Sequence, residues 1–230
     1  MAKTLDDKTI VKDYFNATGF DRWRRIYGDG EVNKVQKDIR VGHQRTIDTV
    51  IGWLEEDNSL TNLTICDAGC GVGSLSIPLA LAGARVYGSD ISEKMVCEAQ
   101  VRAQSALGYK IDRLSLSTQD LESLSGKYHT VICLDVLIHY PTAEARDMIA
   151  HLASLARSRL IISFAPKTVR LSILKKIGEF FPGPSKATRA YQHKESDIIP
   201  ILQENGFTIA RTSMTSTSFY YSRILEAVRL

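Results

Sequence analysis

The alternation of apolar and polar positions divides the chain into a helical first part and a longer part in which strands and helices alternate. In the first part, apolar positions recur at helical spacing, with a break at Thr18-Gly19 and a long amphipathic stretch at residues 35–54. After it, short apolar runs predict strands at residues 63–67, 84–90, 114–120, 128–135 and 159–164. The stretches between them predict helices at residues 74–81, 92–106 and 142–156. This alternation implies right-handed βαβ units and a doubly wound sheet.

The C-terminal part adds two antiparallel strands to this sheet. Residues 207–217 and 219–228 are predicted to form a hairpin after a helix at residues 196–205. We therefore expect an α/β fold with a doubly wound, Rossmann-like sheet of seven mostly parallel strands. A helical arm or lid is expected over residues 1–60 and the core over residues 61–230, with a helical, substrate-side insert after the fifth strand at about residues 167–193.

Composition excludes several classes of protein. The formal charge is +3, from 29 basic and 26 acidic residues among 230, so a global basic field for nucleic acid is not indicated. The cysteines form no C-x-x-C pair and no zinc spacing, and no protein-bound metal is expected. No apolar run approaches the ~18 residues of a membrane span, and the N-terminus has no signal core. We expect a cytoplasmic protein whose membrane contact, if any, is peripheral.

The chemistry-bearing motif is Asp67-Ala-Gly-Cys-Gly-Val-Gly73, directly after the first predicted strand. Glycines let the backbone approach a ligand closely, and the following helix N-terminus completes a polar cradle. The spacing Gly69-x-Gly71-x-Gly73 differs from the G-x-G-x-x-G of dehydrogenases. It resembles motif I of the class I methyltransferases, which implies S-adenosylmethionine as cofactor and S-adenosylhomocysteine as product. In that motif Asp67 organises the ammonium group of the ligand.

Two further carboxylates end strands at the same edge of the predicted sheet. Asp90 follows Gly73 by 17 residues, where a carboxylate can accept both ribose hydroxyls. Asp120 matches the acidic residue that holds the adenine amino group, although a helix cap is the alternative. Apolar neighbours of the strand ends complete the expected cofactor site: Ile91, Leu121, Leu134 and Val136.

The turn after the fourth strand is expected to face the transferable methyl group. Many small-molecule methyltransferases carry an apolar segment followed by histidine here, which singles out His139. Asp135 either organises the backbone of this turn or faces the substrate, and the sequence leaves both open.

Three runs outside the core motifs are more specific. They are Arg22-Trp-Arg-Arg-Ile-Tyr27-Gly-Asp-Gly-Glu-Val-Asn33, Asp38-Ile-Arg-Val-Gly-His43 and Phe181-Pro-Gly-Pro-Ser-Lys186-Ala-Thr-Arg189-Ala-Tyr191-Gln-His193. They resemble the magnesium-protoporphyrin IX O-methyltransferases of chlorophyll biosynthesis, and this resemblance covers essentially the whole chain. The lack of a transit peptide favours the cyanobacterial type. The resemblance further implies handover of the substrate from the H subunit of magnesium chelatase, and peripheral contact with thylakoid membranes.

The resemblance implies that one propionate of the porphyrin becomes a methyl ester. A propionic acid, with a pKa of about 4.3, is a carboxylate at neutral pH and needs no general base. The catalytic residues expected, His139 and Tyr27, would therefore orient the substrate. A flat apolar macrocycle with an acidic edge needs aromatic walls and cations, and the residues expected to bind it are Trp23, Arg24, Lys186, Arg189 and Tyr191. An axial bond to the porphyrin magnesium from His139 or His193 is open.

Other functions remain as alternatives at this point. A methyltransferase for a quinone or other small aromatic would need a base for its phenol or carbon acid. A porphyrin carrier would use the cofactor only structurally. A nucleic-acid methyltransferase is disfavoured because the Asp/Asn-Pro-Pro-aromatic motif is absent after the fourth strand.

Overall fold

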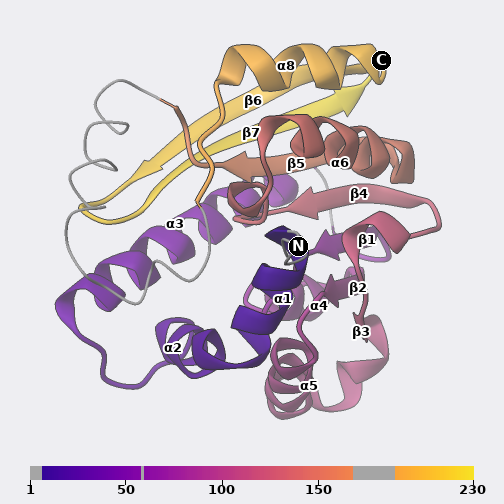
Figure 1. Ribbon diagram of the computed structural model, residues 1–230. Coiled ribbons are helices and arrows are strands. Elements are labelled where there is room, and N and C mark those ends of the chain that lie inside the picture. The colour runs from indigo at the N-terminus through magenta and orange to yellow at the C-terminus, as the bar shows by residue number, and fades with distance from the viewer. Residues whose placement is uncertain (1–6, 58–59, 168–189) are drawn as a thin grey trace, which may run out of the picture.

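The computed structural model describes residues 7–57, 60–167 and 190–230, and a seven-stranded sheet forms its centre (Figure 1). The strand order is β3-β2-β1-β4-β5-β7-β6. Neighbours among β1 to β5 run parallel, whereas β7 is antiparallel to both β5 and β6. The strands are β1 (Thr64–Ala68), β2 (Arg85–Asp90), β3 (Leu114–Thr118), β4 (Tyr128–Cys133), β5 (Ala156–Phe164), β6 (Phe207–Ser216) and β7 (Tyr221–Arg229). The predicted doubly wound, mostly parallel sheet is confirmed.

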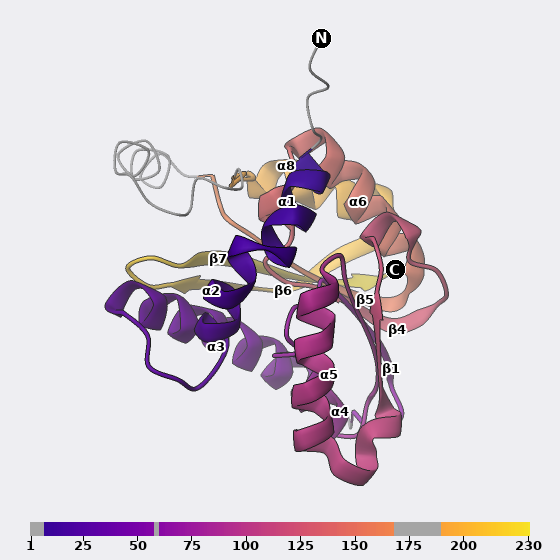
Figure 2. The same cartoon turned by 60° about the horizontal axis from the view of Figure 1, so that its bottom comes forward.

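Helices cover both faces of this sheet, and alternate residues of the central strands supply the two cores beneath them. One face lies under α3 (Lys34–Asp57), α4 (Ser76–Leu81) and α5 (Glu93–Leu107), and the other under α6 (Thr142–Leu155) and α8 (Glu195–Glu204) (Figures 1 and 2). Ile65 and Ile132 are buried toward the first face, and Cys66 and Cys133 toward the second. This alternation is the two-residue period of a strand. These two cysteines therefore act as small hydrophobes.

Local sequence signals account for several element ends. Ser92 caps α5, because its Oγ accepts a hydrogen bond from the Met95 amide at 3.3 Å. The predicted helix from residue 74 is shorter than expected, because the glycine loop continues to Leu75 before α4 begins. Among the described residues, three short 3-10 helices complete the core: η1 (Gly108–Arg113), η2 (Leu121–Ser123) and η3 (Leu137–His139).

The N-terminal arm begins with α1 (Asp7–Asn16) and α2 (Thr18–Ile26), which contact each other, α5 and η3 (Figure 2). The break predicted at Thr18-Gly19 is wrong, since α1 ends before Ala17 and α2 includes both residues. Gly19 is instead a packing position: a Cβ there would lie 2.4 Å from Cε1 of Tyr14. From the predicted arm range, α3 places three side chains in the buried cluster of the sheet's first face: Ile47, Val50 and Leu54.

Most of the predicted insert, residues 168–189, lies outside the described residues. Its two ends lie together, because the Lys167 amide donates to His193 O at 2.8 Å and the His193 amide donates to Ala165 O at 2.9 Å. Among the described helices, none combines the length and apolar character needed to cross a membrane.

Candidate active site

The glycine loop between β1 and α4 is held in a conformation that only small residues accept. Gly69 has a φ of +90°, and a Cβ at this position would lie 2.2 Å from Cγ2 of Val136. The amides of Gly69 and Cys70 both donate to Ser89 O at 2.8 Å, which fixes the loop against the end of β2. Gly71 has a φ of +52°, and a Cβ there would meet no atom within 4 Å. This part of the loop therefore stands open for a ligand.

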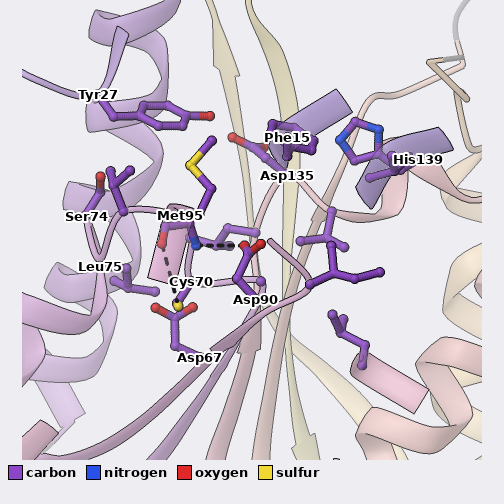
Figure 3. Close-up of a pocket in the computed structure, with 18 of the residues that line it drawn as sticks. Phe15, Tyr27, Asp67, Cys70, Ser74, Leu75, Asp90, Met95, Asp135 and His139 are labelled. Carbon is purple, nitrogen blue, oxygen red and sulfur yellow. Dashed lines mark hydrogen bonds between the residues drawn. The ribbon is translucent and has the colours of Figure 1, made fainter. Parts of the chain in front are cut away.

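Asp90 at the end of β2 is oriented by two backbone amides. Its Oδ2 accepts from the Gly71 amide at 3.0 Å (Figure 3), and its Oδ1 accepts from the Ser92 amide at 2.9 Å. Burial raises the pKa of this carboxyl, while the two amide hydrogen bonds lower it. Each oxygen keeps a further lone pair. The side chain lines the cavity described below and can therefore accept two more donors from a ligand.

Asp67 at the end of β1 lies deeper, and Ser76 supplies its hydrogen bonds. Its side chain is buried, and Ser76 Oγ donates to its Oδ2 at 2.5 Å. Burial raises the pKa of Asp67 to about 6, against the lowering effect of the Ser76 hydrogen bond. Asp67 therefore carries an incompletely compensated charge at neutral pH, which a cationic group in the cavity would stabilise.

A single cavity joins the loop, both carboxylates and the arm (Figure 3). Its empty volume is about 990 Å³, including space open to solvent. The core lines it with Asp67, Gly69, Cys70, Gly71, Val72, Ser74, Leu75, Asp90, Ile91, Met95, Leu121, Leu134, Asp135, Val136, His139 and Tyr140. The helical first part of the chain lines it with Lys8, Val11, Phe15, Tyr27, His43 and Ile47. The cavity is therefore shared by two parts of the chain, and the arm forms one of its walls.

Tyr27 and His139, the two predicted catalytic residues, lie at opposite sides of this cavity (Figure 3). Burial, together with Asp135 and Asp90, raises the pKa of Tyr27 well above its usual value, so its hydroxyl keeps its proton. Burial lowers the pKa of His139 to about 4, so its imidazole is neutral at physiological pH. The Nδ1 atom of His139 is buried, and no hydrogen-bond partner is found for it among the described residues.

The run at residues 38–43 lies in α3, and its residues position the arm and the C-terminal hairpin. The Arg40 guanidinium donates to three carbonyl oxygens at the end of α2 and in the turn after it: Arg25 O at 2.7 Å, Ile26 O at 2.8 Å and Gly30 O at 2.9 Å. The Asp38 carboxylate accepts from Thr217 Oγ1 at 2.6 Å and from the Phe219 amide at 2.7 Å. Both Tyr27, which follows α2, and the turn before β7 are thereby fixed against the same helix.

Asp135, two residues beyond β4, is the most connected carboxylate of the cavity. It has a φ of +58°, a left-handed conformation that costs a non-glycine residue on the order of 1 kcal/mol. His43 Nδ1 lies 3.0 Å and the Tyr220 hydroxyl 2.7 Å from its Oδ2. Ser163 Oγ and Ser222 Oγ donate to its Oδ1 at 3.1 and 3.2 Å. The sequence left open whether Asp135 organises the backbone or faces the substrate, and the structure shows an anchored side chain that also lines the cavity.

Comparisons with known proteins identify the family. The family models "Methyltransferase domain" and "Magnesium-protoporphyrin IX methyltransferase C-terminus" match residues 65–159 and 133–229. The magnesium-protoporphyrin O-methyltransferase of Synechocystis sp. is 74% identical over 225 residues, which cover 98% of this chain and 97% of that protein. The chain belongs to the magnesium-protoporphyrin O-methyltransferase family. The chloroplastic enzyme of Arabidopsis thaliana is 57% identical over 96% of this chain and 71% of that protein.

A crystal structure of the Synechocystis methyltransferase with bound S-adenosylhomocysteine has the same fold. It superposes with a TM-score of 0.90 at 72% identity and covers 98% of this chain and 100% of that chain. The chain described here is thus an S-adenosylmethionine-dependent methyltransferase of the magnesium-protoporphyrin type. The open glycine loop, Asp67 and Asp90 fit this cofactor, because they offer backbone approach and acceptor oxygens for an ammonium group and ribose hydroxyls.

Not all residues predicted for the site of this methyltransferase line the cavity. Gly73 turns the loop with a φ of +83° and packs toward Ile77. Asp120 caps η2 and forms an ion pair with Lys8 of the arm, with 2.6 Å between Oδ2 and Nζ. The predicted cap and a cofactor role of Asp120 are compatible, because the carboxylate has two oxygens.

The porphyrin-binding residues predicted in the arm and insert lie at varying distances from the cavity. The Trp23 ring lies 5.4 Å from that of Tyr27, whereas Arg24 is exposed and lies over Phe20. The Tyr191 amide donates to Ile138 O at 2.7 Å, next to His139. The predicted residues Lys186 and Arg189 lie outside the described residues.

His193, one of two candidates for an axial bond to magnesium, is 1% exposed and its Nε2 donates to Leu137 O at 2.9 Å. It therefore holds the base of the insert against η3 and does not face the cavity.

Proposed function

We propose that this protein transfers the methyl group of S-adenosylmethionine to a propionate carboxylate of magnesium-protoporphyrin IX, giving the monomethyl ester used in chlorophyll biosynthesis. The observation that carries the proposal is the shared cavity: the open loop, Asp67 and Asp90 line one side, and Tyr27 with the arm lines the other. Family membership over nearly the whole chain supports the same acceptor.

The cofactor side follows from the donors that each carboxylate already has. We propose that Asp90 accepts hydrogen bonds from the ribose hydroxyls of the cofactor. We further propose that Asp67 faces the ammonium group of the cofactor, whose positive charge would compensate the negative charge of the carboxylate. Ile91, Leu121, Leu134 and Val136 would form the apolar walls. When bound, S-adenosylmethionine supplies a methyl group activated by its sulfonium.

The acceptor is a carboxylate, and so the protein has to place it rather than deprotonate it. A propionic acid is ionised at neutral pH. A neutral His139 and a protonated Tyr27 suit an orienting role, because both are uncharged groups that can donate a hydrogen bond. Holding an acceptor oxygen in line with the reacting carbon accounts for a large share of the rate that such sites achieve.

The arm is proposed to close the site. The Lys8 ion pair with Asp120 joins α1 to the strand edge at which the cofactor would lie, and Phe15 packs edge-on against His139 with ring centroids 5.6 Å apart. A closed arm would exclude water, which strengthens electrostatic interactions inside the cavity. Trp23, Tyr191, Lys186 and Arg189 remain proposals for contacts with the macrocycle, as does the exposed Arg24.

The direct test is the product. Purified protein incubated with magnesium-protoporphyrin IX and methyl-labelled S-adenosylmethionine should give one labelled monomethyl ester and an equal amount of S-adenosylhomocysteine. Base-labile label on the porphyrin identifies an ester. Transfer to a catechol or a quinol, with none to the porphyrin, would favour the small-aromatic alternative, and S-adenosylmethionine binding without turnover would favour a carrier.

The partner and location are proposed on the same basis. A poorly soluble porphyrin acid favours direct handover from the H subunit of magnesium chelatase, in the cytoplasm and at the periphery of thylakoid membranes. If this is so, adding the porphyrin-loaded H subunit should raise the transfer rate above that obtained with an equal amount of free porphyrin.

A further inference from the structure

His43 is held in one orientation at the wall of the cavity. Its Nδ1 lies 3.0 Å from Asp135 Oδ2, and the side chains of the two residues are 14% and 18% exposed. Because Asp135 is a carboxylate that only accepts, this contact requires the imidazole to carry its proton on Nδ1. The Nε2 atom is then the one left to interact with a ligand, and His43 lines the cavity.

Three features of the surroundings serve to fix this orientation. The Tyr27 ring lies against the imidazole, with 4.4 Å between centroids. The Tyr220 hydroxyl holds Oδ2 of Asp135 from a second direction at 2.7 Å. Gly42 makes room for Tyr220 beside α3, because a Cβ at this position would lie 2.4 Å from Cδ1 of the Tyr220 ring. A glycine inside a helix costs roughly 0.5–1 kcal/mol relative to alanine, so this packing is obtained at the expense of helix stability.

We propose that His43 binds the acceptor carboxylate through Nε2–H, as an imidazolium whose Nδ1 is held by Asp135, and that Tyr220 positions Asp135 for this task. The proposal rests on the proposed function, because it assigns a partner to the acceptor carboxylate named there. The alternative state, with a lone pair on Nε2, would repel that carboxylate. His43 is thus the cation that a neutral His139 does not supply.

The charges around His43 are compatible with this state. The titratable groups that face it are Asp135 after β4, Asp67 at the end of β1, Tyr27 after α2 and Tyr220 before β7. Two of them are carboxylates and two are phenols whose pKa values lie well above the usual value, chiefly because of burial. On its own helix, Asp38 and Arg40 bond to other partners.

The test compares His43→Gln with wild type, using the diacid magnesium-protoporphyrin IX and its dimethyl ester, which has no carboxylate. His151→Gln on α6 serves as the matched control, since it changes a histidine on the opposite face of the sheet. Steady-state kinetics give the KM for each substrate, porphyrin fluorescence gives the Kd of the dimethyl ester, and circular dichroism reports folding.

For His43→Gln we expect the KM of the diacid to rise about ten- to a hundredfold, the range for a hydrogen bond between charged groups. The KM for S-adenosylmethionine and the Kd of the dimethyl ester should stay unchanged. Tyr220→Phe, which keeps the ring, should raise the diacid KM by a smaller factor and stay folded.

Several outcomes would overturn the proposal. An unchanged diacid KM in a folded His43→Gln protein would do so, as would equal losses for the diacid and the dimethyl ester, which indicate a structural role. If His43→Gln fails to fold, the proposal is overturned instead by a Tyr220→Phe variant whose KM for the diacid is unchanged. Absence of any porphyrin ester from the wild type would refute the proposed function instead, so the two failures are distinguishable.

Discussion

Replacing Asp67 by asparagine should stabilise the ligand-free protein while weakening cofactor binding. Burial raises the pKa of Asp67 from 3.8 to about 6, and each pH unit corresponds to about 1.4 kcal/mol, so the ionised side chain costs about 3 kcal/mol at neutral pH. The asparagine oxygen can still accept from Ser76. Its amide N–H group without a partner costs about 1 kcal/mol, which leaves a net gain in unfolding free energy of about 2 kcal/mol.

The sign of the pH dependence provides a second check. Between about pH 4 and 6 the native carboxyl binds a proton that the unfolded chain releases, so this residue's penalty disappears as the pH falls through that range. The variant should therefore be more stable than wild type at pH 7.5. The difference should shrink on acidification and cross zero between about pH 4 and 5. Taking the difference between the two proteins removes the contribution of the titrating groups that do not interact with Asp67.

Urea denaturation at several pH values measures this difference, and Asp147→Asn on the exposed side of α6 is the control. An excess of S-adenosylhomocysteine at the same concentration should then stabilise wild type more than the variant, because the stabilisation grows with the logarithm of the ligand concentration divided by Kd. The reasoning is refuted if Asp67→Asn is no more stable than wild type at pH 7.5, or if the difference does not depend on pH.

Three further changes test other parts of the site. Gly69→Ala places a Cβ against Val136 in a left-handed conformation, so isothermal calorimetry should show a loss of S-adenosylhomocysteine binding and melting should show lower stability; normal binding would contradict the assigned loop geometry. His139→Ala should lower kcat and leave any limb of the pH–rate profile near about pH 6.5 in place, because the pKa of His139 is about 4; loss of that limb would assign His139 a protonation role. Lys8→Met removes an ion pair with Asp120 that is partly exposed, and it should raise the KM for S-adenosylmethionine by at most about fivefold; an unchanged KM would argue against closure of the arm through this contact.

The parts of the fold that depend on local sequence were predictable. Strand and helix periodicity predicted the order of elements, and the spacing of Asp67, the glycines and Asp90 predicted the open loop. Each of these features is set within a few residues: a positive φ strongly favours glycine, and a strand end places its last carboxylate at the sheet edge. The arm's first break was wrong because Gly19 was read as a helix breaker, whereas it serves close packing against Tyr14.

The acceptor side was only partly predictable because its contacts join distant parts of the chain. Asp135 meets His43 across 92 residues and Tyr220 across 85, and no local pattern encodes such pairs. The run at residues 38–43 indicated the family but not what its residues do. Arg24 stays a prediction: a basic residue among aromatic ones suggests a porphyrin contact, and its side chain is exposed on α2 and lies over Phe20.

Asp67 and Asp135 show why the two sides of the cavity behave differently. Asp67 lies at the end of β1 and Asp135 follows β4, the strand paired with β1, and burial is the largest single influence on both, acting in each case to raise the pKa. Asp67 has one side-chain donor, Ser76, so burial prevails and its pKa stays raised. Asp135 has several donors, among them His43 and Tyr220, and its pKa falls below the usual value.

The consequence is a difference in when each charge is stabilised. Asp135 is ionised and has its hydrogen-bond partners before any ligand binds. The free-energy cost of burying its carboxylate is therefore offset by contacts that form when the protein folds, and the acceptor side of the cavity is organised in advance. The charge of Asp67 becomes favourable only when a cationic group binds beside it, so cofactor binding below about pH 6 should release a proton. The same sheet edge thus holds one carboxylate whose charge we expect to be stabilised by the cofactor, and one whose charge is already stabilised by His43 and Tyr220.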